Sequence, residues 1–140
     1  MKRLLITMLF ILILMGCKGM SNYETLKQDV YLMGENIIIL DTEFSVLNAE
    51  HHPFDQSLYK NEKLIYVYIT YEGFISFTSS SLQIILPNDV IKNAYMVDGL
   101  DYLTGPQQAS IPYVRFSIPQ NIEEFILIID DETHVLITWS

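Results

Sequence analysis

Short apolar runs separated by turn residues are the feature that most constrains the fold of this chain. From Val30 onward, stretches rich in Ile, Val, Tyr and Phe alternate with Gly, Pro, Asn and Asp, and no long amphipathic helix pattern appears. β-branched and aromatic residues favour the pleated backbone of a sheet. About eight such runs, spaced roughly 8–12 residues apart, predict an all-β sandwich or barrel.

Two patterns distinguish the expected strands from one another. From Leu40 to Val46 apolar and polar residues alternate, which predicts a strand with one covered face. Leu64–Tyr71 and Phe125–Ile129 are apolar at nearly every position, as in central strands covered on both faces.

Shorter runs predict the remaining strands: 74–77, 82–86, 90–97, 100–103, 113–118 and 135–139, with 93–95 as an alternative helical turn. Turns are expected at Pro87-Asn88-Asp89, Asp98-Gly99, Gly105-Pro106 and Pro119-Gln120-Asn121.

Charge limits what such a domain can bind. The chain has 140 residues, half of them apolar, and 8 Lys and Arg against 17 Asp and Glu give a net charge of −9. Nucleic acids and anionic lipid surfaces are bound through Lys and Arg, so neither is an expected electrostatic partner. With one Cys there is no internal disulfide.

The first sixteen residues look like an export signal rather than part of the domain. Met1-Lys2-Arg3 is basic, and Leu4–Gly16 is apolar except for Thr7. A helix of thirteen residues is roughly 20 Å long, short of the roughly 30 Å hydrocarbon core of a bilayer. We therefore expect a cleaved signal peptide over residues 1–16, with an uncleaved anchor helix as the alternative.

The only cysteine follows this apolar stretch directly. Leu14-Met15-Gly16-Cys17 resembles the lipobox of bacterial lipoproteins, although Met15 stands where a small residue is usual. The resemblance implies cleavage before Cys17, a diacylglycerol thioether on its sulfur, and attachment to the extracytoplasmic face of the cell membrane. Residues 17–28 would be the lipidated cysteine and a short tether, and residues 29–140 the β-sandwich domain. Loss of Lys2 and Arg3 would leave 6 basic and 17 acidic residues, a net charge of −11.

The order of elements behind the leader also resembles the immunoglobulin-like domain of unknown function found on Gram-positive lipoproteins. The similarity rests on an early strand over 37–48, a Tyr- and Val-rich strand over 63–71, the Leu-x-Ile-x-Leu run of 82–86, and a late Gly turn before an aromatic-then-Ile-Pro strand, 105–119. It departs at Glu72-Gly73 and at Pro106-Gln107. The resemblance implies an immunoglobulin-like β-sandwich and carries no catalytic residues.

Two clusters could bind metal, and each also has a simpler interpretation. Glu50-His51-His52-Pro53-Phe54-Asp55 brings imidazole and carboxylate together, with His51, His52 and Asp55 as weak candidate ligands for zinc or copper. Adjacent side chains of an extended segment point to opposite faces, which favours a solvated loop between two strands. Asp130-Asp131-Glu132 with His134 could attract calcium, but lacks the ligand spacing of an EF-hand and fits a hairpin turn better.

No sequence motif indicates catalysis or a cofactor, so we expect the chain not to be an enzyme. Most of its nine Tyr are expected in the core, while a few on a sheet face could form a platform for a partner or sugar. The preferred hypothesis is a lipid-anchored extracytoplasmic binding or structural module that presents a β-sandwich surface to an envelope protein or small ligand. The alternative is a small metal-handling or sensing lipoprotein that uses the His51 and His52 cluster.

Overall fold

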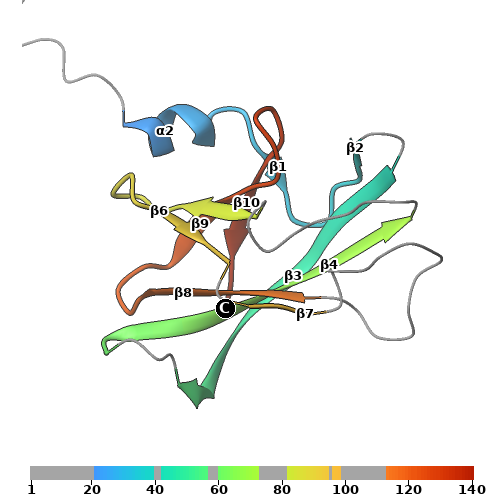
Figure 1. Ribbon diagram of the computed structural model, residues 1–140. Helices are drawn as coiled ribbons and strands as arrows, with labels where there is room; N and C mark the ends of the chain where they lie inside the picture. The colour runs from blue at the N-terminus through green and yellow to red at the C-terminus, as the bar shows by residue number, and fades with distance from the viewer. Residues whose placement is uncertain (1–20, 40–41, 57–59, 73–81, 95, 99–112) are drawn as a thin grey trace, which may run out of the picture.

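The described residues form two β-sheets packed face to face, together with one short helix (Figure 1). The computed structural model describes residues 21–39, 42–56, 60–72, 82–94, 96–98 and 113–140. Each sheet has five strands within these ranges, where the sequence predicted about eight strands in all. The prediction of an all-β sandwich is confirmed.

The first sheet, sheet A, contains strands from both ends of the described chain. Its strand order is β1-β10-β9-β5-β6. The strands are β1 (Tyr31–Leu32), β10 (His134–Thr138), β9 (Glu124–Ile128), β5 (Gln83–Ile85) and β6 (Ile91–Asn93). β1 runs parallel to β10, and the other pairs are antiparallel.

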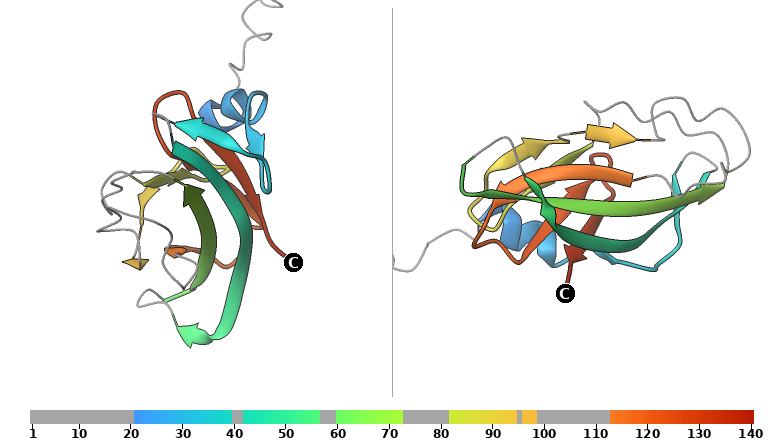
Figure 2. Two further views of the ribbon diagram at one scale, coloured as in Figure 1. Left: turned by 90° about the vertical axis from the view of Figure 1, so that its right-hand side faces the viewer. Right: turned by 90° about the horizontal axis from the view of Figure 1, so that it is seen from below.

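The second sheet, sheet B, is antiparallel throughout and has the order β2-β3-β4-β8-β7. Its strands are β2 (Ile37–Ile39), β3 (Thr42–Gln56), β4 (Glu62–Glu72), β8 (Tyr113–Pro119) and β7 (Met96–Asp98). Figure 2 shows the two longest strands, β3 and β4, curving along their length. Their register shifts between Val46 and Asn48 and again between His51 and Gln56. Such irregularities bend a strand and increase its twist.

The core lies between the sheets and is built from alternate residues of each strand. The side chains of β4 and β8 that face sheet A are Ile65, Val67, Ile69, Tyr71, Val114, Phe116 and Ile118. They pack against Phe125, Leu127, Val135 and Ile137 of sheet A. The rings of Phe116 and Phe125 meet edge to face across the core, with centroids 5.7 Å apart. The predicted central strands are confirmed, because β4 lies between β3 and β8, and β9 between β10 and β5.

A short helix covers the outer face of sheet A. Helix α2 (Asn22–Lys27) begins after Ser21, whose Oγ accepts a hydrogen bond from the backbone N–H of Glu24 at 3.2 Å. Tyr23 is 1% exposed and packs on Ile85 and Ile126. This explains why β9 is apolar on both faces: one face meets sheet B and the other meets α2.

Helix α2 is held by polar contacts as well. The Tyr23 hydroxyl donates a hydrogen bond to Glu124 Oε1 at 2.7 Å, and Lys27 pairs with the same carboxylate. These hydrogen bonds from Lys27 and Tyr23 lower the pKa of Glu124 despite its partial burial. Part of the segment expected as a tether, residues 22–27, is therefore a docked helix. Six residues are too few for helical periodicity to show in the sequence.

Other strand predictions are corrected in detail. The run 90–97 is divided into β6 and β7, which belong to different sheets. Ser45, expected on a polar face, is 4% exposed. The Pro87-Asn88-Asp89 turn is present, closed by a hydrogen bond from Leu86 N to Val90 O at 2.9 Å. The predicted strands at 74–77 and 100–103 and the turn at Gly105-Pro106 lie outside the described residues.

Candidate functional site

The outward face of sheet B gathers aromatic and polar side chains from three strands. Cross-strand partners share a face, and the register pairs Glu50 with Tyr66, Tyr66 with Arg115, and Tyr68 with Tyr113. Their neighbours Ile65, Val67 and Val114 point into the core. We call the outward group, Glu50, His52, Tyr66, Tyr68, Tyr113 and Arg115, the tyrosine face.

The rings of the tyrosine face are in contact with one another. The centroid of Tyr113 lies 5.3 Å from that of Tyr66 and 5.9 Å from that of Tyr68. The His52 ring lies 4.4 Å from Tyr66, tilted by 50°. These separations are typical of favourable aromatic pairs. The rings thus form one continuous aromatic cluster rather than a set of isolated rings.

Tyr66 lies at the centre of this cluster and is its most buried member, at 6% exposed. The Arg115 guanidinium carbon lies 5.4 Å from the centroid of its ring, and Arg115 Nη1 donates a hydrogen bond to the Tyr66 hydroxyl at 3.2 Å. Stacking and hydrogen bonding of this kind hold a guanidinium in one orientation. The positive charge of Arg115 is therefore fixed within the sheet face.

Glu50, His52 and Tyr68 form the polar side of the tyrosine face. His52 Nε2 lies 3.2 Å from Glu50 Oε2 and 3.4 Å from the Tyr68 hydroxyl oxygen. The same ring nitrogen, Nε2, thus lies close to both neighbours. In a catalytic relay, by contrast, the carboxylate contacts one ring nitrogen and the other ring nitrogen acts as the base. Burial raises the pKa of Tyr68, and the Glu50 carboxylate raises it further. Tyr68 therefore stays protonated, and the group is suited to hydrogen bonding and stacking.

The predicted metal ligands His51 and His52 are separated by the sheet. His51 pairs with Ile65 of the core side, whereas His52 contacts Tyr66 on the outward side. Both lie within β3 rather than in the loop that the sequence suggested. Asp55 is near the end of β3, and its side chain lies outside the described residues. Within the described ranges, no three His, Cys, Asp or Glu side chains converge as metal ligands would.

The second predicted cluster forms the hairpin turn between β9 and β10. Asp130 Oδ1 accepts hydrogen bonds from the backbone N–H of Glu132 at 2.9 Å and of Thr133 at 2.6 Å. Although burial opposes ionisation, hydrogen bonds from Thr133 and Glu132 outweigh it and lower the pKa of Asp130. The side chain of Asp130 is thus engaged in the turn, and His134 lies in β10, paired with Ile128.

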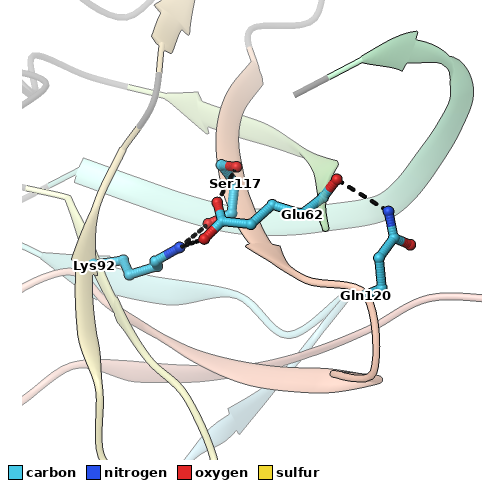
Figure 3. Close-up of polar contacts among 4 residues, drawn as sticks. All are labelled: Glu62, Lys92, Ser117 and Gln120. Carbon is cyan, nitrogen blue, oxygen red and sulfur yellow. Dashed lines mark hydrogen bonds and ion pairs between the residues drawn. The ribbon is translucent and has the colours of Figure 1, made fainter. Parts of the chain in front are cut away.

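A further polar cluster was not expected from the sequence (Figure 3). Lys92 Nζ, from β6 of sheet A, lies 2.6 Å from Glu62 Oε1 and donates to the Ser117 backbone oxygen at 2.8 Å in sheet B. The Ser117 hydroxyl donates to the other oxygen of Glu62. Burial of Glu62 is outweighed by these hydrogen bonds, so its pKa is lowered. The three residues are 25 to 55 positions apart in pairs, so no local pattern indicates that they meet.

Together, the fold and these contacts define an all-β sandwich with an aromatic outer face. No family model, curated protein or solved structure matches the chain. Cys17 lies outside the described residues. Within the described part of the chain, no helix is both long enough and apolar enough to cross a membrane.

Proposed function

We propose that this chain is a lipid-anchored extracytoplasmic binding module, fastened to the cell membrane through Cys17, that presents the tyrosine face to an envelope protein or small ligand. The observation that carries the binding role is the gathering of Tyr66, Tyr68 and Tyr113 with His52 and Arg115 on an outward sheet face. Tyr and Arg are the side chains enriched where proteins bind one another. Because the rings contact each other, little side-chain entropy is lost on binding.

Attachment through Cys17 is tested by labelling cells with radioactive palmitate. The wild-type chain is expected to take up label and to lose its first sixteen residues, whereas Cys17→Ser should take up none and keep its leader. Two acyl chains, at about 0.8 kcal/mol per buried methylene, suffice for stable anchoring where one is marginal. An unlabelled wild-type protein that begins with Met1 would contradict the anchor.

The binding role is tested by capturing partners from the cell envelope with matched variants. The double variant Tyr68→Ala with Tyr113→Ala removes two rings of the tyrosine face. Tyr31→Ala is the control, because Tyr31 is 42% exposed on β1, in the other sheet. The tyrosine-face variant is expected to lose its captured partner while the control retains it. If both variants capture the same molecules as wild type, the tyrosine face is not the binding surface.

A further inference from the structure

Strand β2 forms one edge of sheet B in the part of the chain that the structure describes. Its three residues are all isoleucine, and within the described ranges β2 pairs only with β3. Backbone N–H and C=O groups along a free edge can pair with another strand. Proteins usually prevent this with Lys, Pro or an inward-pointing charge, as Lys92 provides on the edge strand β6. β2 has no such residue.

The middle residue of this edge is unusually exposed for its type. Ile38 is 77% exposed, while Ile37 is buried at 2% and Ile39 packs partly against the core. Ile37 and Ile39 thus fix β2 to the sandwich, and Ile38 stands free on the opposite face. A second strand placed beside β2 could cover Ile38 with an apolar side chain of its own.

A hollow next to this edge carries negative charge. It has a volume of about 420 Å³ and is lined by Ile38 and Ile39 together with Asp130, Asp131, Glu132 and Thr133 of the β9–β10 turn. In Figure 1 this turn and β2 lie at the same end of the molecule. The Asp130 carboxylate is engaged by the backbone of the turn, whereas the Asp131 and Glu132 side chains are exposed. A side chain entering the hollow from an added strand would meet these two acids.

These features together identify one kind of occupant. We propose that the β2 edge binds an extended basic segment of a partner protein by strand addition, with alternating apolar and Lys or Arg side chains. The apolar residues cover Ile38, and the basic ones enter the hollow beside Asp131 and Glu132. A second copy of the chain is disfavoured, because a symmetric β2–β2 contact would bring two acidic turns of a molecule with net charge −9 together.

This edge belongs to a different part of sheet B from the tyrosine face, and the proposal does not depend on lipidation. The test uses the full-length protein in detergent and a fluorescent eight-residue peptide that alternates Lys and Val, followed by fluorescence polarisation at low ionic strength. The matched peptide has Glu in place of Lys. The Lys peptide is expected to bind and the Glu peptide to bind at least tenfold more weakly. Equal binding of both, or no binding of the Lys peptide, would overturn the proposal.

Protein variants separate the apolar and charged contributions. Ile38→Lys should weaken binding of the Lys peptide about tenfold or more. The double variant Asp131→Asn with Glu132→Gln should weaken it about three- to tenfold, because two ion pairs with the peptide are lost. The control is the double variant Glu24→Gln with Glu123→Gln, which changes the net charge by the same amount. Both residues lie away from β2: Glu24 is on α2, which packs on β9, and Glu123 directly precedes β9. The control should retain wild-type affinity. If the control weakens peptide binding as much as the Asp131 and Glu132 variant does, the loss of affinity is due to overall charge, and the proposed site is overturned.

Hydrogen exchange then tests whether the peptide adds a strand. Amides of Ile37–Ile39 that point away from β3 are expected to gain protection when the Lys peptide binds. Unchanged exchange there would overturn strand addition even if the peptide binds. Sedimentation of the peptide-free protein gives the remaining outcome: a dimer that Ile38→Lys dissociates would assign the edge to a second copy and overturn the proposed partner.

Discussion

Lys92 makes a polar link between the two sheets, and its contribution to stability can be measured. Its ammonium group reaches from β6 to the Glu62 carboxylate and the Ser117 carbonyl of sheet B. Lys92→Met should lower the free energy of unfolding by about 1–2 kcal/mol, because Glu62 then loses a partner in a partly buried site. Urea unfolding measures this change. Lys60→Met is the control: Lys60 is exposed, so its loss should matter by less than about 0.5 kcal/mol.

The same cluster gives a pH dependence with a defined sign. Because hydrogen bonds hold the pKa of Glu62 below its ordinary 4.5 in the folded protein, the unfolded chain takes up this proton first as acid is added. Stability from Glu62 is therefore present above pH 4.5 and lost as the pH falls through the lowered folded pKa. The difference in stability between wild type and Lys92→Met should narrow as the pH falls below 4.5. A difference that stays constant over this range would mean that Lys92 does not act through Glu62.

His52 and Glu50 allow a direct test of the metal hypothesis. They supply two possible ligands on one face, while His51 lies on the other side of the sheet. Two ligands hold zinc weakly compared with the three or four of a structural or catalytic site. Thermal denaturation with excess zinc, copper or calcium should move the midpoint by less than about 1 °C. A larger stabilisation that His52→Ala abolishes would favour the metal-handling alternative instead.

At the scale of elements, helix α2 should behave as part of the folded domain. Tyr23 is buried against sheet A and donates to Glu124, so Tyr23→Ala removes both packing and a hydrogen bond. We expect a loss of about 3–4 kcal/mol, as for other large-to-small substitutions of buried aromatics. Tyr23→Phe removes only the hydroxyl and should cost about 1 kcal/mol. Equal losses in the two variants, measured by denaturant unfolding, would mean that the ring contributes nothing to docking.

The elements also show what local pattern can and cannot predict. The runs that became β4 and β9 were recognisable as central strands because both of their faces are apolar. Helix α2, which covers one of those faces, was missed, since six residues with a single buried ring carry too little periodicity. The division of 90–97 between two sheets was also missed, because membership of a sheet depends on distant partners rather than on the run itself.

The candidate site was predictable only in part, for a similar reason. The sequence left open that a few of the nine Tyr form a platform on a sheet face, but it predicted the core for most of them and did not single out which would face outward. That Tyr113, Arg115 and Glu50 join Tyr66 and Tyr68 depends on the register of β4 with β8 and β3, which the sequence does not specify locally. The exposed Ile38 was likewise indistinguishable from its two isoleucine neighbours until the pairing of β2 was known.

At the scale of the whole molecule, the proposed membrane attachment has to act against the acidity of the chain. Processing at Cys17 would leave a net charge of −11, which anionic lipid headgroups repel. Lipid-mediated attachment should therefore resist salt. Membranes washed in about 1 M NaCl, where the Debye length is about 3 Å, are expected to retain the protein, and detergent should release it. The Cys17→Ser chain, which is expected to keep its leader, is grown and washed in parallel. It shows how much retention an uncleaved leader gives without lipid. Release of the wild-type protein by salt alone would show that ionic contacts hold it, and would contradict attachment through acyl chains.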